Sequence, residues 1–127
     1  MGTDKKYEIT VTGRTRYIAE QSDPDADRYV FAYTITIKNE GTLSAQLISR
    51  HWIFTDANNQ VQEVRGLGVI GEQPLLKAGE SFEYTSGTVL TTPVGTMRGT
   101  YQMVGEDGRR FDTPVPALTL SMPRVLH

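Results

Sequence analysis

The sequence predicts an all-β fold, a β-sandwich or a barrel, on three observations. Apolar residues nowhere recur at helical spacing over ten or more residues. Several segments instead alternate apolar and polar residues with a period of two, as half-buried strands do. Turn-forming residues punctuate the chain about every 8–12 residues, which is typical of sandwiches and barrels. With 127 residues and no shift in composition, the chain is predicted to form a single domain, residues 1–127.

The first strand is expected over residues 7–12 and continues over 14–18 beyond a bend at Gly13. An acidic loop over 20–27 then precedes the clearest alternation in the chain, over 29–38. This second strand is rich in aromatic and β-branched residues. Its odd-numbered side chains are predicted to face the core: Tyr29, Phe31, Tyr33, Ile35 and Ile37.

The next strand, expected over 44–55, has a mixed pattern. Its apolar residues fall on both faces, with Leu47 and Ile53 on one and Ile48, Trp52 and Phe54 on the other. A strand buried on both faces, or a bulged strand, has this pattern. A turn at 56–59 then predicts a hairpin with residues 60–64.

Four strands are expected in the second half, over residues 82–90, 97–104, 109–115 and 118–122. The pair Asp107-Gly108 predicts a tight hairpin turn between the second and third of them. Three side chains of the second are predicted to join the core: Met97, Tyr101 and Met103.

Composition excludes several classes of function. The absence of cysteine excludes disulfides, a thiolate zinc site and a cysteine nucleophile. A net charge of −2 argues against unspecific nucleic-acid binding, although a local basic patch stays open. No apolar run reaches the length of a membrane span, and residues 1–6 do not form a signal peptide. The sequence therefore predicts a soluble cytoplasmic protein.

A glycine-rich stretch carries the pattern G-x-G-x-x-G at Gly66, Gly68 and Gly71. In dinucleotide-binding folds, this pattern opens a helix whose N-terminus faces the pyrophosphate. Pro74 would interrupt such a helix, and no acidic residue lies about twenty positions on to bind a ribose. The favoured interpretation is that the glycines serve the backbone geometry of a β protein.

An alternative keeps a binding role for this stretch. Arg65 and the backbone N–H groups of Gly66, Gly68 and Gly71 would bind an anion or a pyrophosphate compound such as a nucleotide, and a hydrolase activity is included in this alternative.

The acidic loop offers weak metal candidates. Asp23, Asp25 and Asp27 match the first three ligands of an EF-hand loop. The sixth position is Arg28 where glycine is needed, and the twelfth is Thr34 where a bidentate glutamate is needed. A solvated loop is the favoured interpretation, and no cofactor is predicted.

No catalytic constellation is visible. His51 and His127 are the chain's two histidines, and no nucleophile elbow or phosphate-binding G-K-[ST] loop accompanies them. The sequence therefore predicts a protein that is not an enzyme.

Four segments together resemble the ApaG family: residues 49–56 (SRHWIFTD), 64–74 (VRGLGVIGEQP), 79–87 (GESFEYTSG) and 92–103 (TPVGTMRGTYQM). The resemblance extends over nearly the whole chain. It departs from the family's pattern at Asn59, where glycine is expected, and asparagine also tolerates the left-handed conformation. A second departure is His127, where the family more often has asparagine.

The resemblance implies a bacterial protein with an immunoglobulin-like, fibronectin type III-like antiparallel β-sandwich. Family members are linked to cobalt and magnesium resistance, and related domains occur in larger eukaryotic proteins, which implies protein binding. We therefore expect a binding module with a protein partner, for which Arg50, His51 and Glu72 form the candidate surface. The oligomeric state stays open, a homodimer included.

Overall fold

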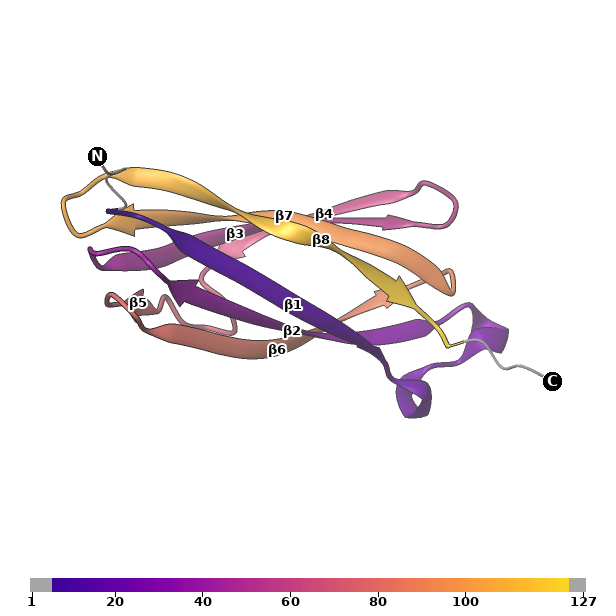
Figure 1. Ribbon diagram of the computed structural model, residues 1–127. Coiled ribbons are helices and arrows are strands. Elements are labelled where there is room, and N and C mark those ends of the chain that lie inside the picture. Colours follow the sequence, from indigo (N-terminus) through magenta and orange to yellow (C-terminus); the bar gives the residue numbers. More distant parts are fainter. Residues whose placement is uncertain (1–5, 124–127) are drawn as a thin grey trace.

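Two antiparallel sheets pack face to face, as Figure 1 shows for the computed structural model. The structure describes residues 6–123, so His127 lies outside it. One sheet has the strand order β1-β2-β6, and the other has the order β4-β3-β7-β8 with β5 paired to β3. The strands are β1 (Ile9–Tyr17), β2 (Tyr29–Asn39), β3 (Ala45–Asp56), β4 (Val61–Leu67), β5 (Leu75–Leu76), β6 (Ser81–Leu90), β7 (Val94–Gly105) and β8 (Arg110–Ser121). The predicted all-β sandwich is confirmed.

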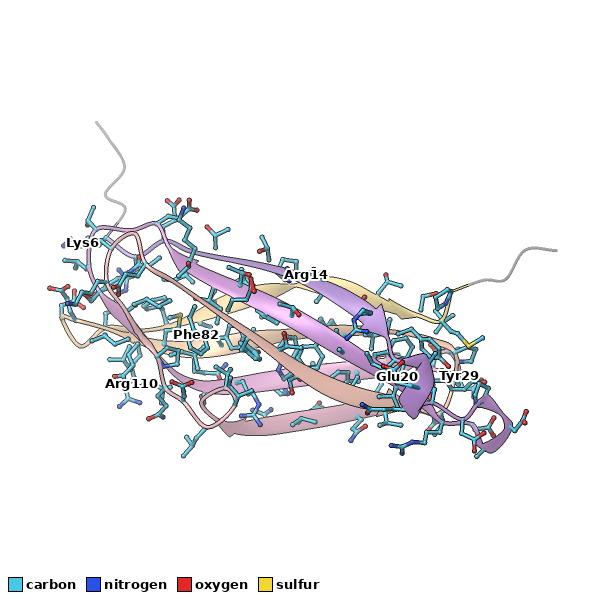
Figure 2. The ribbon with its side chains drawn as sticks, turned by 90° about the horizontal axis from the view of Figure 1, so that it is seen from below. Lys6, Arg14, Glu20, Tyr29, Phe82 and Arg110 are labelled. Carbon is cyan, nitrogen blue, oxygen red and sulfur yellow. The ribbon has the colours of Figure 1, made fainter. Side chains whose placement is uncertain are left out.

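Two short 3₁₀ turns, η1 (Ala19–Gln21) and η2 (Pro24–Ala26), join β1 to β2. Within residues 6–123, no helix has the length and apolar character needed to span a membrane. Figure 2 shows the long axis of the sandwich, with Lys6 and Arg110 toward one end and Glu20 and Tyr29 toward the other.

The central strand β2 shows why the alternation predicts its faces. It pairs with β1 along one edge and with β6 along the other. All five of its predicted core residues are buried, and Ile35 and Ile37 are 0% exposed. Met97, Tyr101 and Met103 of β7 are buried opposite them, as predicted.

A bulge in β3 explains its mixed pattern. The pairing with β7 shifts between Leu47 and Ser49, so Ile48 is an extra residue in that ladder. One extra residue reverses the alternation. Leu47 before the bulge and Trp52 after it are therefore both buried, whereas Ile53 is half-buried. The prediction that Leu47 and Ile53 share a face apart from Trp52 is wrong, and the bulged alternative is correct.

The C-terminal segment forms one strand where the sequence predicts two. β8 runs unbroken, and its pairing with β7 shifts where Met97 faces Leu118 and Gly99 faces Val115. Pro116 and Ala117 thus lie opposite the single residue Arg98, which makes a second bulge. A proline is tolerated here because β8 is an edge strand.

Trp52 lies at the centre of the core. Its ring meets Tyr33 and Tyr101 edge to face, with centroid distances of 5.6 Å and 5.9 Å, and Phe54 lies 6.3 Å away. Such edge-to-face pairs add to the stabilisation that burial of the aromatic surface already provides.

The two long sides of the sandwich differ. On one side the edge strands β1 and β8 meet, and the Thr15 hydroxyl donates to the Thr119 carbonyl oxygen over 2.7 Å. On the other side β4 pairs only with β3, and β6 only with β2, among the strands described. This open side positions the candidate site.

Candidate functional site

A groove of about 480 Å³ follows the open side between β4 and β6. Its wall and floor combine aromatic, apolar and hydroxyl groups with one arginine. The lining includes Tyr33, Arg50, Trp52, Val64, Ile70 and Tyr84. The volume lies within the range of ordinary ligand sites.

Arg50 enters the groove from β3. It is two residues before Trp52, so its side chain leaves the same face of the strand. Its Nη1 donates to the carbonyl oxygens of Leu67 (3.1 Å) and Gly68 (2.8 Å). Among residues 6–123, no carboxylate lies within ion-pair distance of Arg50.

Gly66 allows the guanidinium group to lie against β4. A Cβ at this position would lie 2.9 Å from Nη1 and 3.0 Å from Cζ and Nη2 of Arg50. Gly66 therefore serves the close approach of Arg50 to the strand.

The rest of the glycine-rich stretch is a tight turn and not the start of a helix. Gly68 and Gly71 have φ values of +63° and +79°, which favour glycine. Val69 and Glu72 exchange backbone hydrogen bonds of 2.8 Å and 2.9 Å across the turn, and the Gly68 N–H donates to the Ile48 carbonyl oxygen over 2.8 Å. The prediction that these glycines serve backbone geometry is confirmed at both positions. The N–H groups of Gly68 and Val69 already have acceptors, which leaves fewer of them for an anion.

Ile70, in the same turn, has an unusual backbone. Its φ is +44°, although it is β-branched and its side chain stands at the groove. The other described non-glycine residues with positive φ are Asp27 and Asn59, types that tolerate this region. A β-branched residue there stores strain, and such strain tends to occur at functional sites.

Two tyrosines meet beneath the groove. The hydroxyls of Tyr84 on β6 and Tyr101 on β7 are 2.5 Å apart and link the two sheets. Burial raises the pKa of Tyr84 to about 12, against the opposing effect of the Tyr101 hydrogen bond. Burial, with the nearby Tyr84, raises the pKa of Tyr101 as well. Both hydroxyls are therefore protonated at neutral pH.

Alkaline pH is expected to weaken the fold through this pair. The folded pKa of Tyr84 is about 12 and its ordinary value is 10.0, so the folded chain binds the proton more tightly. The contribution of Tyr84 to the free energy of unfolding is complete below its ordinary pKa, and it is lost as the pH rises through the pKa of the folded state. Urea unfolding at a series of alkaline pH values should show this fall in the free energy of unfolding. The free energy of unfolding of Tyr84→Phe should fall less steeply with pH. Equal slopes for the two proteins would contradict the assignment.

Trp52 supplies an unusual group to the same region. Its side chain is 1% exposed, and its Nε1 is the one buried side-chain polar atom among the described residues that lacks a hydrogen-bond partner. A buried donor without an acceptor is costly, so each instance calls for an explanation.

The predicted partner surface is divided between two faces. His51 and Arg65 face each other across β3 and β4 on the outer face, where they line a second hollow that shares Arg50 and Leu67 with the groove. Both approach Glu63, at 3.2 Å for His51 Nε2 and 3.8 Å for Arg65 Nη2. Glu63 and Arg65 are largely exposed, so these contacts contribute little to stability. Glu72 lies exposed in the turn.

The acidic loop does not gather its carboxylates. Asp23 precedes η2, and Asp27 follows it with φ +54°. Within residues 6–123, no group of three or more His, Cys, Asp or Glu side chains is placed to hold a metal ion.

Sequence reasoning missed the groove residues Tyr33, Trp52 and Tyr84 as site residues, because it assigned aromatic strand residues to the core alone. The one available signal was the alternation of Arg50 with Trp52 and Phe54, which places a cation on an otherwise apolar face.

The chain is similar to known proteins over its full length. Residues 19–105 match the family model described as the ApaG domain. Proteins named ApaG from Thiobacillus denitrificans and Nitrosospira multiformis are 68% and 64% identical over 127 residues, which is 100% of each chain.

Two solved structures have the same fold. A crystal structure of an ApaA protein from Bordetella pertussis is 58% identical, with a TM-score of 0.93 over 97% of this chain and 100% of that one. An X-ray structure of a structural genomics target is 48% identical, with a TM-score of 0.88 over 98% of this chain and 92% of that one.

Proposed function

The chain belongs to the ApaG domain family, and from this premise we propose that it is a cytoplasmic binding module without catalytic activity. We infer that it binds an extended segment of a partner protein as an additional strand along β4. The observation that carries the proposal is Ile70, an apolar residue that is 54% exposed and held at positive φ beside the groove.

The edge strands support β4 as the docking edge. β8 carries Pro114 and Pro116, which remove backbone donors, and it is covered by β1. β4 contains no proline and carries two exposed apolar side chains, Val61 and Leu67. An unpaired edge with exposed apolar residues is a template for strand addition.

Ile70→Asn is expected to separate stability from binding. Asparagine tolerates positive φ, so the free energy of unfolding should rise by about 1 kcal/mol. Peptides selected from a displayed library of random linear peptides on the unaltered chain should bind the variant about tenfold more weakly or worse, because an apolar contact is lost. Urea unfolding and calorimetry measure the two effects.

Leu75→Asn is the matched control. Leu75 is 56% exposed, similar to Ile70, but it lies outside the groove. This variant should keep the affinity of the selected peptides. A library that enriches no binder, equal losses in the two variants, or turnover of a substrate by the purified chain would contradict the proposal.

A second candidate is the anion or pyrophosphate compound at Arg65 and the backbone of residues 66–71. The exposed side chain of Arg65 favours it. Titration with pyrophosphate and nucleotides should then move the amide resonances of those residues, and unchanged spectra would exclude it.

In this proposal, the family's effect on cobalt and magnesium resistance arises through the partner protein and not through metal bound by this chain. The scattered carboxylates of Asp23, Asp25 and Asp27 support this view over direct metal binding. Millimolar magnesium, calcium or cobalt should leave the resonances of that loop unchanged.

A further inference from the structure

Arg50 is a half-buried cation without a counterion. Two carbonyl oxygens satisfy its Nη1, but neither carries a formal charge, and no carboxylate of residues 6–123 reaches it. Charges removed from water are ordinarily paired, because desolvation disfavours the isolated ion. The positive charge therefore points to an anion from outside residues 6–123.

The residues that line the groove with Arg50 are rich in donors, and Asp112, which borders the neighbouring hollow, forms no ion pair with Arg50 among residues 6–123. None of the residues that line the groove is Asp or Glu. Tyr33 and Tyr84 line it with phenol groups, and Trp52 contributes the buried Nε1–H that has no acceptor. Gly99 of β7 lies close to the Cε3 edge of the indole, because a Cβ at this position would be 2.8 Å from Cε3. The Tyr84 hydroxyl already shares a hydrogen bond with Tyr101, so the groups that an entering anion would complete are the Arg50 charge and the Trp52 Nε1–H.

The charge favours a carboxylate over a phosphate. One guanidinium group neutralises one negative charge, and Arg50 is the only charged side chain that lines the groove. A carboxylate carries one charge and accepts two parallel N–H bonds from an arginine. A phosphate ester would bring up to two charges and leave the excess partly desolvated.

We infer that the groove recognises an acidic side chain of the bound partner segment, with its carboxylate paired to Arg50 and within reach of the Trp52 indole N–H. This inference rests on the proposed strand addition along β4. Side chains of an added strand alternate between the two faces, so the acidic residue that faces inward should have apolar neighbours two positions away on either side. Val64 and the exposed Ile70 supply apolar surface for those neighbours.

Selection from the same library of random linear peptides tests the residue preference. The unaltered chain and Arg65→Gln should both enrich an acidic residue with apolar residues two positions away, because Arg65 does not line the groove. Arg50→Gln should enrich peptides without that acid. Failure to enrich any peptide would count against the proposed strand addition itself. Binders without an acidic preference, or a preference that survives in Arg50→Gln, would overturn the carboxylate site and leave strand addition standing.

Nuclear magnetic resonance gives a second measurement on folded protein. Trp52 is the only tryptophan, so its indole N–H gives a single resonance. A selected peptide should shift this resonance downfield, and the same peptide with Gln in place of its acid should bind at least about tenfold more weakly, as loss of a charge-assisted hydrogen bond predicts.

Two milder variants guard against misfolding of Arg50→Gln. Arg50→Lys keeps the charge but loses the fork of parallel donors, and Tyr84→Phe removes one hydroxyl. Both variants should weaken binding of the acidic peptide more than binding of the same peptide with Gln in place of its acid. Equal weakening of the two peptides would contradict the site. Phosphate or pyrophosphate that displaced the peptide at a lower concentration than acetate would show that the groove prefers a phosphate, and would overturn the choice of a carboxylate.

Discussion

Ile35→Ala is expected to lower the free energy of unfolding by about 2–5 kcal/mol. Ile35 is 0% exposed at the middle of β2, between β1 and β6, and its side chain packs in the cluster around Trp52. The change removes buried apolar atoms and leaves a cavity that the surrounding strands cannot fill without moving. Because a whole domain is stable by only about 5–15 kcal/mol, the melting temperature should fall markedly.

Thr34→Ala is the control for this experiment. Thr34 is the neighbouring residue on the opposite face of β2, where its hydroxyl shares a 2.8 Å hydrogen bond with Thr85 near the surface. Loss of a solvent-accessible hydrogen bond costs about 1 kcal/mol at most. Calorimetry should therefore show a large fall in melting temperature for Ile35→Ala and a small one for Thr34→Ala. Equal falls would mean that the faces of β2 are misassigned.

Gly68→Ala is expected to destabilise the fold by about 2 kcal/mol or more, because two effects add. Its φ of +63° disfavours any residue with a Cβ. A Cβ there would also lie 2.3 Å from the carbonyl oxygen of Glu72, so the turn would have to open. Urea unfolding measures the loss, and amide exchange should be faster over the turn than in β2.

Gly71→Ala isolates the first effect. Its φ is +79°, but a Cβ at this position meets nothing within 4 Å. The expected loss is about 1 kcal/mol, the conformational part alone. If Gly71→Ala were as harmful as Gly68→Ala, the contact with Glu72 would not be the cause. Micromolar nucleotide binding that Gly68→Ala abolished without any change in stability would restore a ligand role for these glycines.

The secondary structure could be predicted because it depends on local pattern. Alternation along residues 29–38 identifies both the strand and its buried face, since successive side chains of a strand point to opposite sides. The glycines at 68 and 71 could likewise be assigned to backbone geometry, because Pro74 excludes a long helix within the same few residues.

The candidate site was only partly predictable. Gly66, Gly68 and Arg50 do meet, but through the guanidinium group and two carbonyl oxygens. Arg65, predicted to act with the glycines, lies on the outer face beside His51. The alternation of Arg50 with Trp52 and Phe54 is the only sequence signal that separates the two arginines, and it acquires meaning only once that face of β3 is known to border the groove.

The all-β class, the turns and the faces of β2 and β7 follow from the spacing of residues along each strand, so they could be predicted from the sequence alone. The bulges at Ile48 and at Pro116, the direction of Arg50 and the side on which the sandwich stays open depend on contacts between distant segments. A bulge exists only relative to the strand opposite, so its position depends on pairing between residues far apart in the chain. The groove follows from the same cause, since it lies where the edge strands β4 and β6 find no further partner among residues 6–123.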